Sequence, residues 1–172
     1  MTQRTCFLLL VAALTLFSNC RKPDDSGLHT RVEIFGLQNF EWTGPGICDV
    51  HPSSVVLESA PLAANGDIVS YNVSNYLFEF KEPAAQKIRN LSPRTPFALT
   101  LDGEILFIGV VMQNIMSSTC FESITMENLS FGPHHAKLEL GYPGGINPSL
   151  EDKRIDAALL AALPATPGAA SG

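Results

Sequence analysis

Several segments of the chain alternate polar and apolar residues with a period of two, which predicts short strands. Residues 31–35, 68–73 and 76–80 are of this kind, and the turn-forming triplet at 65–67 precedes the second. Residues 55–57, 121–126 and 136–140 are further strand candidates. The pattern therefore favours a protein built mainly on a sheet.

The clearest hairpin follows residue 96. Residues 97–101 lead into Asp102-Gly103, and residues 104–112 lead out. Asp-Gly suits the positive φ angles of a tight hairpin turn. Residues 105–112 are apolar on both faces, so we expect this strand to be central and covered on both sides.

Two segments show the helical period. The first begins at Pro83 and places apolar residues at positions 84, 88 and 91 on one stripe. The second is expected to begin at Ser149, with Asp152 completing a capping box and Ile155 on the apolar stripe, and to stop before Pro164.

This order predicts an α+β fold with an antiparallel or mixed sheet and one or two helices, in a ferredoxin-like split arrangement. We expect a single domain over residues 31–163. Residues 164–172 consist of Pro, Ala, Thr, Gly and Ser, which predicts a disordered tail.

The N-terminus has the pattern of an export signal. Arg4 precedes an apolar run over residues 6–17, then Ser18-Asn19-Cys20 and a polar stretch. The run is shorter than the roughly 20 residues that a membrane-spanning helix needs. Residues 1–19 are therefore predicted to be a signal peptide, and residues 20–30 a tether.

A cysteine at the cleavage point resembles the lipoproteins of the Bacteroidota, although Phe17 and Asn19 depart from the usual lipoprotein pattern. The resemblance implies that Cys20 carries lipid, such as palmitate, and becomes the mature N-terminus. The protein would then be an outer-membrane lipoprotein of the bacterial cell envelope, facing the periplasm or the cell surface. The alternative is an ordinary cleaved signal in which Cys20 is incidental.

Charge and composition narrow the class of partner. Removing residues 1–19 leaves 172 − 19 = 153 residues, and loss of Arg4 takes the formal charge from −6 to about −7. No Lys/Arg cluster follows residue 22, which argues against nucleic-acid binding. A hydrophobic fraction of 45% with 16% charged residues is enough for a packed core.

Two cysteines remain for the folded domain, because Cys6 leaves with the signal and Cys20 would carry lipid. In an oxidising compartment Cys48 and Cys120 are expected to form a disulfide that holds the Trp42 loop against residues 117–120. Two buried free thiols are the alternative.

Catalytic and metal motifs are weak. The sequence has no G-x-S-x-G and no phosphate-binding loop. His134-His135 and the Cys48/His51 spacing are the nearest approach to a metal site, but a zinc site needs three or four ligands. We therefore predict neither a metal nor a cofactor.

Aromatic residues could serve a binding groove or the core. At strand spacing the core is the better interpretation for most of them. Trp42, in a loop beside Gly44, is the candidate contact residue.

The hairpin at 97–105, together with the strand and helix before it, resembles the first periplasmic head domain of SecD, a protein-export subunit. That family carries an Ala-x-x-Leu-Asp-Gly-x-Val pattern there, and the similarity covers residues 67–112. The resemblance implies an α+β head domain that contacts other proteins.

Together these features predict a non-catalytic, lipid-anchored envelope domain that binds a protein or a glycan. The alternative is a secreted enzyme whose site is assembled from loops and leaves no motif.

Overall fold

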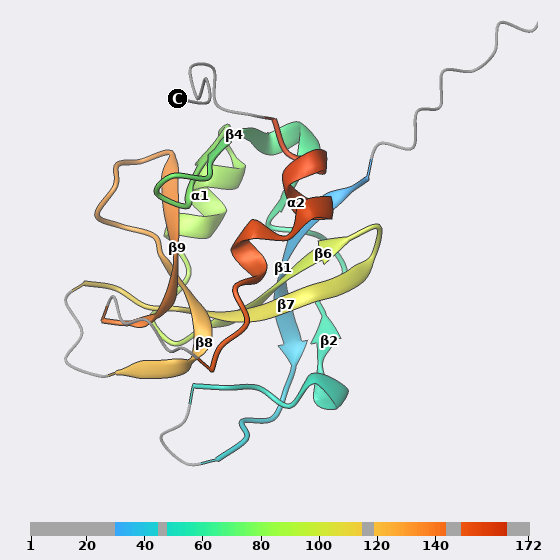
Figure 1. Cartoon of the computed structure of the whole chain (residues 1–172), viewed down its shortest axis with the longest axis vertical. Coiled ribbons are helices and arrows are strands. Elements are labelled where there is room, and N and C mark those ends of the chain that lie inside the picture. Colours follow the sequence, from blue (N-terminus) through green and yellow to red (C-terminus); the bar gives the residue numbers. More distant parts are fainter. Residues whose placement is uncertain (1–29, 45–47, 115–118, 144–148, 165–172) are drawn as a thin grey trace, which may run out of the picture.

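The computed structural model of the chain describes residues 30–44, 48–114, 119–143 and 149–164. Figure 1 shows a mixed sheet with two α-helices at one end and β2 at the other, which confirms the predicted α+β class. The strands are β1 (Val32–Asn39), β2 (Val56–Leu57), β3 (Ala63–Ala64), β4 (Ile68–Asn72), β5 (Leu77–Phe80), β6 (Pro96–Leu101), β7 (Glu104–Val111), β8 (Cys120–Glu127) and β9 (His135–Tyr142), and the helices are α1 (Ala84–Arg89) and α2 (Ala157–Ala162).

The nine strands of the described residues lie in the order β2-β1-β6-β7-β8-β9-β5-β4, with β3 paired to β1. Among the described strands, β7 and β8 are parallel and the other pairs are antiparallel. Helix α1 connects β5 to β6, which are not neighbours, and α2 follows the last strand. The arrangement therefore differs from the ferredoxin-like one, in which both helices connect strands.

The core joins strands from opposite ends of this order. Val32 of β1 and Tyr71 of β4 belong to one buried cluster, which Ile88 of α1 and Leu159 of α2 also enter. The sheet must curve strongly for these positions to meet, as twisted sheets do. Most of the aromatic residues at strand spacing are part of this core, as expected: Tyr71, Phe78, Phe80, Phe97 and Phe107 are buried.

The predicted hairpin turn is confirmed. Asp102 and Gly103 have φ angles of 50° and 88°, and they join Leu101 of β6 to Glu104 of β7. The Asp102 carboxylate also accepts a hydrogen bond of 2.7 Å from the backbone N–H of Arg31. The turn therefore fixes the start of β1 as well as that of β7.

The C-terminal helix begins later than the sequence predicts. A 3₁₀ turn over Lys153–Ile155 comes first, and Asp156 then caps α2 by accepting hydrogen bonds from the N–H groups of Ala158 (2.9 Å) and Leu159 (3.2 Å). Ile155 is 50% exposed and lies outside the apolar stripe. A second good cap, Asp156, directly before an Ala/Leu run overrides the one expected at Ser149.

Arg154 anchors this C-terminal segment to the sheet. Its buried guanidinium donates two 2.8 Å hydrogen bonds to the Asp152 carboxylate and one of 3.2 Å to the carbonyl of Leu138 in β9. It also stacks 3.6 Å from the centre of the Tyr76 ring. The Arg154 carbonyl accepts a hydrogen bond from the Tyr71 hydroxyl, so both the side chain and the backbone are held.

Hydrogen bonds from Arg154 lower the pKa of the Asp152 carboxyl from its ordinary value of 3.8. A carboxyl whose pKa is depressed by folding stabilises the protein above its unfolded pKa, and this contribution is lost as the pH falls through the folded pKa. The ion pair should therefore be intact at neutral pH and fail only in acid.

Asp152→Asn should destabilise the chain by about 1 kcal/mol or more at pH 7, because the buried guanidinium loses its partner. It should also flatten the fall in unfolding free energy between about pH 5 and 2. Urea denaturation across that pH range measures both effects. Glu151→Gln is the control, because its pair with Lys153 is exposed and should contribute little. Equal behaviour of the two variants would contradict the anchoring role of Arg154.

Candidate functional site: an open strand edge beside the disulfide

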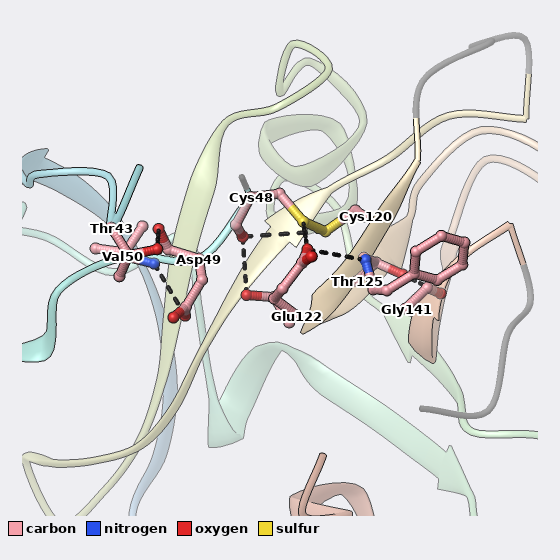
Figure 2. Close-up of a disulfide and its surroundings, with 10 residues drawn as sticks. Thr43, Cys48, Asp49, Val50, Cys120, Glu122, Thr125 and Gly141 are labelled. Carbon is pink, nitrogen blue, oxygen red and sulfur yellow. Dashed lines mark hydrogen bonds between the residues drawn. A yellow bond between two sulfur atoms is a disulfide. The ribbon is translucent and has the colours of Figure 1, made fainter. Parts of the chain in front are cut away.

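The predicted disulfide is present. Cys48 and Cys120 are bonded, with their Cα atoms 5.5 Å apart, and each residue is 1% exposed. Figure 2 shows the bond with Glu122 beside it. The bond joins the loop after β1 to the start of β8 across a sequence separation of 72 residues.

The backbone after Cys48 lies along the first half of β8. The carbonyl of Cys48 accepts a 2.8 Å hydrogen bond from the Ser123 hydroxyl, and the Glu122 carboxylate lies 3.5 Å from the Cys48 sulfur. A small apolar cluster, separate from the main core, surrounds the bond and contains Val110, Met112 and Tyr142. The start of β8 is therefore held by covalent, polar and apolar contacts together.

Trp42, the predicted contact residue, lies at this same end of the molecule. Its backbone forms an antiparallel bridge with Val50, and its half-buried ring packs against the disulfide cluster. The ring meets Phe40 edge-on at 5.2 Å, and the Arg94 guanidinium lies 5.9 Å from its centre. The structure thus brings together Trp42, Cys48 and Cys120, while Cys20 lies outside the described residues.

Next to this end, β7 and β8 separate from one another. They pair only over Gly109–Val111 and Ile124–Met126. Between Cys120 and Ile124, β8 has a register shift against β9, and Cys120 itself is tied to Cys48. The first half of β7, Glu104–Ile108, therefore has β6 on one side. On the other side, within the described part of the chain, only the carbonyl of Ile108 at the end of the ladder reaches β8.

Backbone alternation identifies which groups face the open side. The N–H of Val111 bonds to the carbonyl of Thr95, so alternate residues of this ladder face β6, and Ile108 faces away. At the other end, Leu101 and Glu104 flank a two-residue turn and bond to each other, which directs the backbone of Ile105 outward. Ile105 and Ile108 thus present N–H groups along the open edge.

Two adjoining hollows follow this edge. One, of about 550 Å³, is lined by residues 103–108 together with Pro52 and Leu57. The other, of about 230 Å³, lies where β7 and β8 part, between residues 49–52 and the segment Leu150–Lys153. They share Pro52 and residues 106–108, and we call the two together the β7 groove.

The groove has an apolar floor and an acidic rim. Leu106 and Ile108 are half-buried along it, and Ile105 is 40% exposed. Its lining includes more carboxylates than cations: the acidic members are Asp49, Glu104, Glu122 and Glu151, and the basic one is Lys153, which is paired with Glu151 at 2.7 Å. A ligand that carries positive charge is therefore favoured.

Sequence reasoning missed this groove, although a signal was present. The apolar run at 105–112 predicts a strand covered on both faces, and only its second half meets that expectation. Val110, Val111 and Met112 are fully buried, whereas Glu104 and Ile105 are exposed. The site is therefore marked by a strand whose sequence is apolar enough to be buried but whose first residues are exposed.

The residues considered for metal binding do not converge. His134 lies 3.9 Å from Glu82 and both side chains are about half exposed, while Cys48 is committed to the disulfide. Within the described ranges, no group of three His, Cys, Asp or Glu side chains could hold a metal ion. The described helices also include none long and apolar enough to cross a membrane.

Comparisons with protein-family models, with curated proteins and with solved structures find no match for this chain.

Breaking the disulfide in a Cys48→Ala/Cys120→Ala variant should lower the unfolding free energy by on the order of 4 kcal/mol, because closing a long loop constrains the unfolded chain. Urea denaturation with and without reductant measures this loss. Reductant should destabilise the wild type and leave the double variant unchanged. Alkylation of Cys48 and Cys120 themselves in the unfolded, unreduced wild type, located by peptide mass mapping, would contradict the bond, because Cys6 and Cys20 can also react.

Proposed function

We propose that this chain is a lipid-anchored protein of the bacterial envelope whose folded domain binds another protein. The proposal rests on one observation: a buried disulfide lies next to an open strand edge. Structural disulfides persist in oxidising compartments and are rare in the cytosol, which supports export of the domain. The signal-like pattern at residues 1–19 supports the same compartment independently.

The anchor in this proposal is lipid on Cys20. The tether that follows Cys20 is short and polar, and the described domain begins about ten residues after Cys20. Such a tether would keep the domain close to the membrane surface while leaving its faces accessible.

A protein partner fits the β7 groove better than a glycan does. An open strand edge offers backbone donors and acceptors in the spacing of another strand, and the half-buried Leu106 and Ile108 offer apolar contact. The role is binding, because the groove supplies recognition surface and its carboxylates are distributed along the rim.

Cys20→Ala should abolish incorporation of a labelled fatty acid and release the chain from the membrane fraction. The matched control is Cys6→Ala, which changes the other N-terminal cysteine inside the apolar run and should keep the label. Gel analysis of metabolically labelled cells decides the outcome. Retention of label by the Cys20 variant would contradict the anchor.

A photocrosslinking amino acid at Ile105 should capture a discrete protein in intact cells. The same amino acid at Val69 of β4 is the matched control, since both side chains are 40% exposed. Mass spectrometry of the crosslinked species measures the result. Identical capture from both positions, or none from Ile105, would count against a binding role for the groove.

A further inference from the structure

The open edge of β7 defines what shape of ligand can enter the groove. Glu104–Ile108 spans five residues, or about 17 Å of extended chain at roughly 3.3 Å per residue. Ile105 and Ile108 direct N–H groups toward the side that β8 has left. Among the described residues, the unpaired edge of β7 therefore has the length and the hydrogen-bonding pattern of one short strand.

The walls of the groove keep this place vacant. On one side the disulfide and the Ser123 hydrogen bond hold the start of β8 beside Cys48. On the other, Arg154 fixes the segment that carries Leu150 and Lys153. An incoming strand would take the place beside β7 that the first residues of β8 leave.

The acidic rim selects the charge of that strand. Glu104 and Glu122 are exposed, and the Glu151 side chain is 75% exposed. A second copy of this chain would bring the same carboxylates against one another, which disfavours self-pairing. A strand with basic residues on one face and apolar residues on the other would meet both the rim and the floor.

We propose that the β7 groove binds an extended, basic segment of a protein partner by adding it as a strand beside β7. This inference rests on the proposed binding role and names the chemistry of the partner. Backbone hydrogen bonds would supply affinity, while the alternating side chains would supply selectivity.

The test uses the full chain in neutral detergent and a fluorescent, end-capped hexapeptide of alternating Lys and Val. Anisotropy titration should show saturable binding. An alternating Glu and Val hexapeptide should bind at least 10-fold more weakly. The Lys/Val peptide with N-methyl groups on alternate residues keeps its charge but loses strand donors, and should also bind at least 10-fold more weakly.

Chain variants locate the binding. Glu104→Lys should weaken binding of the Lys/Val peptide several-fold. Glu82→Lys makes the same charge change on an exposed residue outside the groove and should leave binding unchanged. Thermal melts of both variants verify folding. In the wild type, the peptide should slow amide exchange at Ile105 and Ile108.

Other outcomes overturn the inference. Absence of binding, or equal binding by the N-methylated peptide, would reject strand addition. Peptide-free dimers that protect Ile105 would assign the groove to a second copy. Protection of Ile105 by an oligosaccharide instead of the peptide would assign it to a glycan. Any of these results, combined with a protein crosslinked at Ile105 in cells, would leave the proposed function standing.

Discussion

The Cys48–Cys120 disulfide is the constraint on which the proposed site depends. It places the start of β8 beside the loop after β1, and the Ser123 hydrogen bond to the Cys48 carbonyl extends the contact along the strand. In a parallel pair the backbone hydrogen bonds are evenly spaced along both strands. Here pairing stops at Gly109 and Ile124, and the covalent bond accounts for why β8 does not continue along β7.

The second constraint is electrostatic. Arg154 is buried against Asp152, the Leu138 carbonyl and the Tyr76 ring, and it fixes the segment before α2 over the sheet. Burying a guanidinium is costly unless its donors are satisfied, and several of them are satisfied here. Two unrelated interactions thus hold opposite walls of the β7 groove, which allows a strand edge to remain open in a folded protein. Edges of this kind are normally covered or protected, and the open edge among the described residues is the reason that we propose a binding role for this groove.

Local signals in the sequence were sufficient for much of the fold. The Asp102-Gly103 turn, the strand pattern and the helix after Pro83 depend on neighbouring residues, and the structure contains all of them. The disulfide followed from counting cysteines after removing Cys6 and Cys20. Features that depend on long-range contacts could not be predicted from such local signals. The parallel pairing of β7 with β8 depends on contacts between distant segments, and the late start of α2 depends on competition between two caps.

The candidate site was predictable only in part for the same reason. Trp42 and the two cysteines were placed together correctly, because the disulfide requires it. The groove was not predicted because an apolar run such as 105–112 indicates that the strand is buried, but it does not indicate which segments bury it. In this chain the fold covers one half of the strand and leaves the other half only partly covered, with Ile105 exposed and Phe107 in the core.

Residue-resolved amide hydrogen exchange of the free, oxidised chain tests the open edge most directly. We expect rapid exchange at Ile105 and Ile108, whose N–H groups face the unpaired side, and slow exchange at Phe107 and Gly109, which face β6. Equally slow exchange at all four residues would show that another part of the chain already pairs with this edge, and would contradict the account.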